Sequence, residues 1–310
     1  MHVAVYCPFL ASAVLGVTSP WLARRLPPAT ASRLLAAGGL GAALATVSAL
    51  AVLTFLVLAR VPAVAEQGHW SSGALDAAVP VPRAVAVVAL PALAVAVVRT
   101  ARLVVDRGRA MAAARALCRE LGGTPGQLVV VEDDVAAVAV PAAGGRVLVS
   151  RAQLAALPAV ERRALLLHER AHLAHGHHRH RFLAEGAAAL DPLQARLPGA
   201  VRFATERWAD ESAAAELGDR SAVARALARS GLRAQRPVPA PWAAVALGSG
   251  GSRVVQRVEA LLAPAPRQRP VVLVAALLVV AFGPATAVHA QADTEEVVEH
   301  AVPADLPAAR

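Results

Sequence analysis

The stretch ALLLHERAH at residues 164–172 joins an apolar run to two histidines that are four positions apart. Residues four apart lie on one face of an α-helix, so His168 and His172 can present both imidazoles to one metal ion. Glu169 would project beside that ion, where a carboxylate can take a proton from water. The pattern predicts a helix with a catalytic zinc site, in which the histidines are ligands and Glu169 is the general base.

A catalytic zinc usually has three protein ligands and one open position, so a third ligand must come from outside this stretch. The best candidate is Glu206, which lies 34 residues beyond the second histidine. Asp210 follows one helical turn later, where it can orient a ligand histidine from behind. A solvated, charged helix face is the alternative interpretation of this acid pair, and Glu185 and Asp191 are substitute ligands.

The composition is that of a membrane protein. Of the 310 residues, 56% are hydrophobic and 17% are charged, and the mean hydropathy is +0.51. This is too apolar for an ordinary soluble domain. Runs that are long enough to cross a bilayer as helices lie at four places: Val3–Leu22, Leu34–Ala59, Ala84–Val98 and Val271–Ala290.

The basic residues indicate how the chain is oriented and what it does not bind. All 31 are arginines, and they concentrate in the connection 23–33 and in the segment 99–269. Arginine gathers on the cytosolic side of membranes, so both termini are expected outside and the segment 99–269 in the cytosol. Aromatic residues make up only 3% of the chain, which leaves no stacking set for bases. No direct nucleic acid binding is expected.

The segment 99–269 is long enough to bury a core of its own. β-branched runs predict a small antiparallel sheet, and the rest is mainly helical. The predicted strands are Leu128–Glu132, Val135–Pro141 and Arg146–Ser150; the predicted helices are Asp106–Leu121, Glu161–Glu185, Phe203–Leu217, Ser221–Ser230 and Arg253–Leu262, with a loop at Pro237–Gly251. Either of the last two strands is a candidate edge for an extended substrate.

With these residues and this order of segments, the chain resembles the BlaR/MecR family of membrane zinc metallopeptidases. The resemblance rests on the histidine motif, on the later pair Glu206 and Asp210, and on three apolar runs before the domain and one after it. It implies an α-helical membrane protein with four transmembrane helices and an inserted α+β zincin-like metallopeptidase domain. The implied parts are three transmembrane helices in 1–98, a cytosolic zinc metallopeptidase domain at 99–269, a fourth transmembrane helix at 270–290 and an extracytoplasmic tail at 291–310.

The resemblance also implies a function. It predicts a zinc endopeptidase in the cell membrane that cleaves a protein or peptide, such as a transcriptional repressor. Only about twenty residues follow the last apolar run, so the extracellular penicillin-binding sensor of the best-known members is not expected. The alternatives are an HtpX-like peptidase for quality control of membrane proteins, and a non-catalytic signalling scaffold that retains the fold.

Six of the ten histidines lie within residues 168–180. The four beyond the motif helix can be read as a basic helix end near anionic lipid, as a second metal site or as part of a metal transporter. A transporter should place ionisable ligands inside membrane helices, and the apolar runs carry almost none. Peptide hydrolysis also needs a donor to the developing oxyanion, for which the candidates are His177, Arg202 and Arg207.

Overall fold

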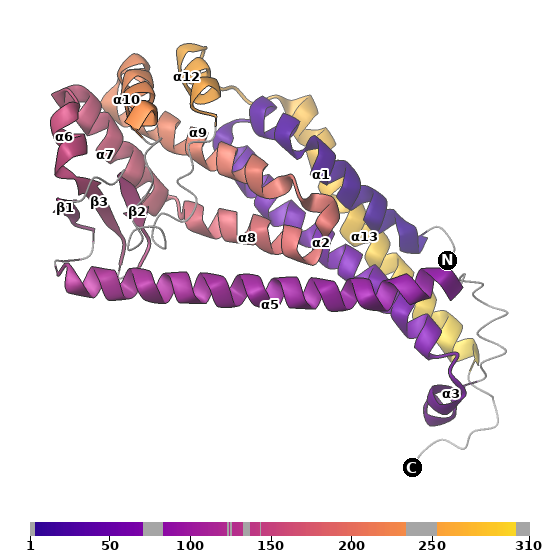
Figure 1. The fold of residues 1–310 in the computed structure, drawn as a ribbon. Coiled ribbons are helices and arrows are strands. Elements are labelled where there is room, and N and C mark those ends of the chain that lie inside the picture. The colour runs from indigo at the N-terminus through magenta and orange to yellow at the C-terminus, as the bar shows by residue number, and fades with distance from the viewer. Residues whose placement is uncertain are drawn as a thin grey trace.

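The computed structural model describes residues 4–70, 83–122, 124, 126–132, 137–142, 144–233 and 253–301. It is mostly helical and elongated, with a helical bundle at one end and a head that contains a small sheet at the other (Figure 1). The helices of the bundle are α1 (Cys7–Arg25), α2 (Pro28–Leu58) and α13 (Pro270–Ala301); α5 (Arg83–Glu120) runs from the bundle to the head, and α3 (Pro62–Gly68) lies at the bundle's far end.

Within the described residues, three helical stretches are long and apolar enough to cross a membrane: Pro28–Leu58, Val88–Glu120 and Pro270–His289. They correspond to the second, third and fourth predicted runs. The first run forms α1, which is not among the three and buries the polar side chains of Ser12 and Ser19. A membrane-crossing role for α1 therefore stays a prediction, and so does the total of four.

Two helices that the sequence predicts as separate form one helix. The runs Ala84–Val98 and Asp106–Leu121 both lie in α5, which has 38 residues. The stretch between them contains no proline or glycine, so nothing in it ends the helix. Arg99, the first charged residue of this stretch, donates from a terminal nitrogen to the carbonyl of Ala188 at 2.7 Å. The predicted domain boundary at residue 98 thus falls inside a continuous helix.

The sheet has the strand order β1, β3, β2. β3 (Arg146–Ser150) pairs in parallel with β1 (Leu128–Val131) and antiparallel with β2 (Val138–Val140). The prediction of an antiparallel sheet is therefore wrong for β1 and β3, which run parallel. β3 lies between the two strands that precede it in the chain. As a result β3 is central, and β2 is the edge strand that lies next to α7.

Six further helices surround the site. In chain order they are α6 (Arg151–Ala156), α7 (Ala159–Ala174), α8 (His177–Leu190), α9 (Leu197–Leu217), α10 (Arg220–Arg233) and α12 (Val254–Leu262). The single helix predicted at Glu161–Glu185 is in fact α7 and α8. Gly176 lies between them with φ +61°, a left-handed conformation that glycine adopts without strain and that commonly ends a helix. The predicted loop Pro237–Gly251 lies outside the described residues.

Helices α8 and α9 form a hairpin that packs against α1 and α2. Its tip, residues 191–194, contains the short 3-10 helix η2 (Pro192–Gln194). There Asp191 accepts hydrogen bonds from the hydroxyl of Ser12 and from the amide of Leu193, and the amide of Gln194 donates to Ser12 and to the carbonyl of Gly39. These bonds attach the hairpin tip to two helices of the bundle.

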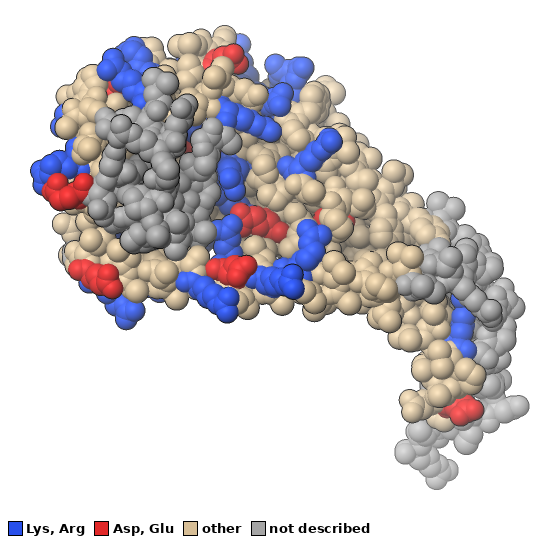
Figure 2. Space-filling view, in the orientation of Figure 1, with Lys and Arg blue, Asp and Glu red and all other residues tan. Residues whose placement is uncertain are grey.

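Charged side chains are unevenly distributed over the surface. In Figure 2 most of the blue and red residues lie over the head, whereas the stretch of the bundle next to it is mostly tan. Many large apolar side chains of α5 and α13 are exposed, among them Val97 at 60% and Leu278 at 66%. An uncharged, apolar belt on one end of the molecule suits contact with lipid.

Candidate metal site

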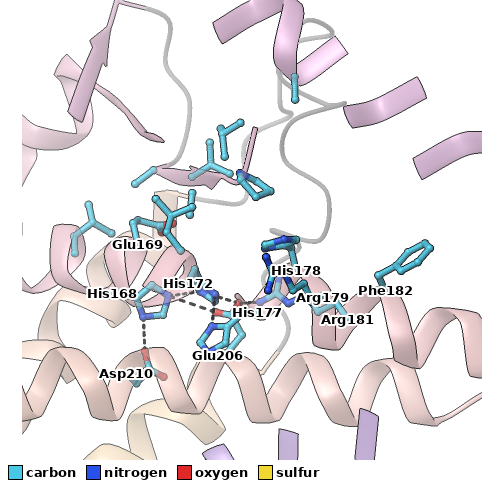
Figure 3. A pocket seen from close by; sticks show the side chains of 18 of the residues that line it. His168, Glu169, His172, His177, His178, Arg179, Arg181, Phe182, Glu206 and Asp210 are labelled. Atoms are coloured by element: carbon cyan, nitrogen blue, oxygen red, sulfur yellow. Dashed lines mark hydrogen bonds and ion pairs between the residues drawn. The ribbon is translucent and has the colours of Figure 1, made fainter. Parts of the chain in front are cut away.

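Two helices that cross in the head position the predicted site residues. α7 carries His168, Glu169 and His172, and α9 passes beneath it with Glu206 and Asp210 (Figure 3). Leu167 and Ala164 of α7 pack with Ala213 and Ala214 of α9 in one apolar cluster, which fixes how the two helices cross. The sequence-predicted residues from both helices therefore come together at one place.

The ligand cluster consists of His168, His172 and Glu206, and it is the group of potential metal ligands found among the described residues. Nε2 of His168 lies 3.1 Å from Nε2 of His172. The Glu206 carboxylate oxygens lie 3.7 Å from the first of these nitrogens and 3.5 Å from the second. A tetrahedral zinc with bonds of 2.0–2.1 Å holds its ligand atoms about 3.3 Å apart, so the spacing fits this ion.

The outer nitrogens of both imidazoles are occupied. Nδ1 of His168 lies 2.9 Å from an oxygen of Asp210, and Nδ1 of His172 lies 2.7 Å from Nδ1 of His177. A histidine that donates from Nδ1 turns the lone pair of Nε2 outward, as metal-ligating histidines do. When both histidines donate from Nδ1, the lone pairs of the two Nε2 atoms face the same point, as in a two-histidine metal site.

The two ligand histidines differ in their pKa values. Burial lowers the pKa of His168, but hydrogen bonds to Asp210 and Glu206 outweigh it and raise the pKa to about 10. Burial lowers the pKa of His172 to about 3. Near neutral pH, without a metal, His168 is therefore protonated and His172 neutral, and zinc binding would release one proton from His168.

Glu169 lies beside the ligand cluster and is 8% exposed. Burial raises the pKa of its carboxyl group to about 7, against the lowering effect of the charge on His168 and of a hydrogen bond from the backbone of Ala139. A carboxyl group with a pKa near the working pH can both accept and return a proton. Its position and acidity suit the general base that the sequence predicts.

Two arginines that the sequence does not single out hold Glu206. Arg181 of α8 donates to one carboxylate oxygen of Glu206 and, through Nε, to the hydroxyl of Thr205 at 3.1 Å. Arg257 of α12 lies 2.7 Å from the other oxygen. Although burial raises the pKa of Glu206, the charges of Arg257, His172 and Arg181 and a hydrogen bond with His168 hold it well below its usual range. Glu206 is therefore ionised, as a metal ligand must be.

A cavity of about 800 Å³ opens over the ligand cluster. Its walls come from α5, β2, α6, α7, α8, α9, α10 and α12, and its apolar lining includes Val104, Met111, Val138 and Phe182. Glu169 and both ligand histidines line it. The space is large enough for a segment of polypeptide rather than for water alone.

Other candidates from the sequence lie elsewhere. Neither substitute ligand belongs to the ligand cluster: Glu185 lines the same cavity but pairs with Arg107 of α5, and Asp191 lies at the hairpin tip. Arg207, a proposed oxyanion donor, donates instead to the backbone carbonyls of Ala23 and Arg24 at the end of α1.

Three of the four extra histidines gather around the ring of Trp208. His177 is buried behind His172, and His175, His177 and His180 all contact the ring of Trp208. The left-handed turn at Gly176 folds the start of α8 back onto α7, and it thereby places His177 against His172. Among the described residues, no metal-ligand group other than His168, His172 and Glu206 is found.

Comparison with known families bears on this geometry. Residues 109–235 match the profile of Peptidase family M48, a family of metallopeptidases. The matched segment spans less than half of the chain. It contains the ligand cluster, Glu169 and Asp210, whereas Arg257 lies beyond its end. Neither the curated proteins nor the solved structures gave a match, and membership of the BlaR/MecR family stays a prediction.

Proposed function

We propose that this protein is a membrane-bound, zinc-dependent endopeptidase. The observation that carries the proposal is the convergence of His168, His172 and Glu206, beside Glu169, on the wall of a large cavity in the segment that matches family M48. The donor set of two imidazoles and one carboxylate suits zinc and leaves a fourth position open. The three apolar helical stretches suit anchorage in a bilayer.

Each residue has a defined part in peptide hydrolysis. His168, His172 and Glu206 would hold zinc, which supplies Lewis acidity toward water and the scissile carbonyl. Glu169 takes a proton from the attacking water and delivers it to the leaving amine, two tasks that a pKa of about 7 allows. Asp210 accepts a hydrogen bond from His168 and keeps that imidazole in its ligand orientation.

The edge of β2 is the proposed binding edge for an extended substrate. Residues Ala137 to Pro141 line the cavity, and within the described part of the chain β2 pairs only with β3. β3, the other strand considered from the sequence, is paired on both sides. A peptide that adds to β2 would run past Glu169, because the backbone of Ala139 hydrogen-bonds to that carboxylate.

The substitution Glu169→Gln tests this proposal. It preserves shape but removes the proton acceptor, so the purified protein in detergent should keep about one zinc per chain and lose cleavage of casein about a hundredfold or more. Glu216→Gln, an exposed change on α9, is the matched control and should keep both properties. Unchanged cleavage in Glu169→Gln would refute the mechanism, and wild-type protein that binds zinc but cleaves nothing would favour the scaffold alternative.

The finer role that we propose is regulatory cleavage of a cytosolic protein such as a transcriptional repressor, as in the BlaR/MecR-type peptidases that the sequence resembles. Its support is the order of elements, with α1, α2 and α5 leading into the site and α13 following it. The cytosolic placement of the site rests on the arginine distribution. HtpX-like quality control is the alternative.

These roles differ in what accumulates when cleavage stops. In cells that carry Glu169→Gln, regulatory proteolysis predicts that one DNA-binding regulator rises in abundance. Quality control instead predicts a rise of many damaged membrane proteins. Quantitative proteomics of the two strains measures the difference, with Glu216→Gln cells as the reference.

A further inference from the structure

Arg257 is the residue through which α12 contacts the metal site. Its side chain is 8% exposed. Nε and one terminal nitrogen donate to the two oxygens of Asp210 at 2.8 and 2.7 Å, and the other terminal nitrogen lies 2.7 Å from Glu206. All three nitrogens of the guanidinium group are thus engaged with two carboxylates of α9.

This arrangement fixes residues that the proposed mechanism uses. Asp210 and Glu206 lie one turn apart on α9 and are both buried or nearly so, so their negative charges repel each other in a region of low dielectric constant. The single positive charge of the guanidinium group lies on both carboxylates and offsets part of this repulsion. Because it is planar, its fork also sets the orientation of the Asp210 carboxylate, whose Oδ1 lies 2.9 Å from Nδ1 of His168.

The helix that carries Arg257 is held firmly against the segment that matches family M48. Arg220 of α10 donates to the carbonyls of Ala260 and Leu261 at the end of α12, at 2.9 and 3.0 Å. Leu261 is 3% exposed and packs in the apolar cluster that also joins α7 to α9. α12 is therefore fixed at one end by packing and capping, and one turn earlier by Arg257.

We propose that Arg257 is a positioning residue of the metal site, which holds Asp210 against His168 and Glu206 toward the two histidines. The proposal rests on the proposed function, since those residues are assigned there to zinc. It makes α12 a required part of a site whose other members lie in the segment that matches family M48. It also links that site, through residues 263–269, to the apolar helix α13.

The test measures zinc affinity of the full-length protein in detergent by competition with a chelator. Arg257→Ala should weaken zinc binding about ten- to a hundredfold, the range typical of residues that orient a metal ligand. Arg257→Lys keeps the charge but cannot make the planar fork, so it should recover only part of the loss. Arg225→Ala removes an arginine that is half-exposed and pairs with Glu161 and Asp219, and it should bind zinc as the wild type does.

A double variant asks whether Arg257 acts through Asp210. If it does, Arg257→Ala added to Asp210→Asn should weaken zinc binding less than it does alone, because the contact with Asp210 is already impaired and only the contact with Glu206 remains to be lost. Full additivity would overturn the proposal, and so would wild-type affinity in Arg257→Lys, which would mean that the charge alone matters. That lysine variant also provides the test if Arg257→Ala does not fold.

The failure of this proposal differs from a failure of the proposed function. Wild-type zinc affinity in both Arg257 variants would remove Arg257 from the site but leave the histidine ligands in place. Retention of zinc after His168 and His172 are both replaced by alanine would instead refute the metal site itself.

Discussion

Two buried polar groups lie at opposite ends of the α8–α9 hairpin, and they are built differently. At the tip, Asp191 is 1% exposed and accepts from Ser12 and from the backbone, so its oxygens already have donors. At the ligand cluster, the inner nitrogens of His168 and His172 face each other 3.1 Å apart. Both ends thus contain a buried or nearly buried acid, Asp191 at the tip and Glu206 at the ligand cluster. Only the ligand cluster also has two histidine nitrogens that face each other.

The hairpin tip is tightly packed, whereas the ligand cluster lies next to open space. At the tip, Gly16 and Gly39 let α1 and α2 approach the hairpin so closely that a methyl group on Gly16 would lie 2.1 Å from the carbonyl oxygen of Leu193. Over the ligand cluster there is a cavity of about 800 Å³. The tip thus serves to hold the hairpin in the bundle, whereas the ligand cluster borders an open cavity.

The largest expected effect is the loss of metal from the ligand cluster. Replacement of both His168 and His172 by alanine removes two of three ligands, so bound zinc should fall from about one per chain to none. Elemental analysis of the purified protein measures this. His178→Ala, which changes an exposed histidine of α8 that lines the cavity but is outside the ligand cluster, is the matched control and should keep its zinc. Full occupancy in the double variant would show that the metal lies elsewhere.

The next largest effect is a loss of stability from a substitution at the hairpin tip, which should leave the ligand cluster intact. Gly16→Ala forces a methyl group against backbone, and overpacking of this kind costs up to about 3 kcal/mol. Thermal unfolding in detergent, followed by tryptophan fluorescence, should show the loss, while the folded fraction binds zinc with unchanged affinity. Gly41→Ala is the control, because its methyl group would meet Pro284 at 3.7 Å, an ordinary contact. Equal stability of the two variants would contradict the close approach.

The smallest effects come from the same substitution at both ends. Asp210→Asn should lower zinc affinity about ten- to a hundredfold, because the amide is a weaker acceptor for His168 and a poorer partner for Arg257. Asp191→Asn should leave zinc affinity unchanged and cost about 1 kcal/mol of stability through weaker hydrogen bonds. If the two variants lost zinc to the same extent, the distinction between the two ends would be wrong.

Much of the site follows from short-range sequence pattern. The spacing of His168 and His172 on one helix face needs only the helical period, and the pair Glu206 and Asp210 needs the same period once more. The structure brings all four side chains together with Glu169. Their chemical roles stay predictions until metal and activity are measured.

The parts that the sequence did not predict depend on contacts between distant residues. Arg257 pairs with Asp210 across 47 positions and lies in no motif, so no local signal marks it among 31 arginines. The parallel pairing of β1 with β3 depends on the order in which the chain places its strands, which periodicity does not encode. By contrast, the break at Gly176 had a local signal, since glycine between two helical runs is a common stop.

The unbroken course of α5 determines how deep the cavity lies relative to a membrane. After the apolar stretch the first charge is Arg99, and the first residue of α5 that lines the cavity is Val104. Five residues of α-helix advance about 7.5 Å, close to the thickness of one layer of lipid headgroups. With α5 across a bilayer, the near edge of the cavity therefore borders the headgroup layer, and a polypeptide that enters there does so at the water–lipid boundary.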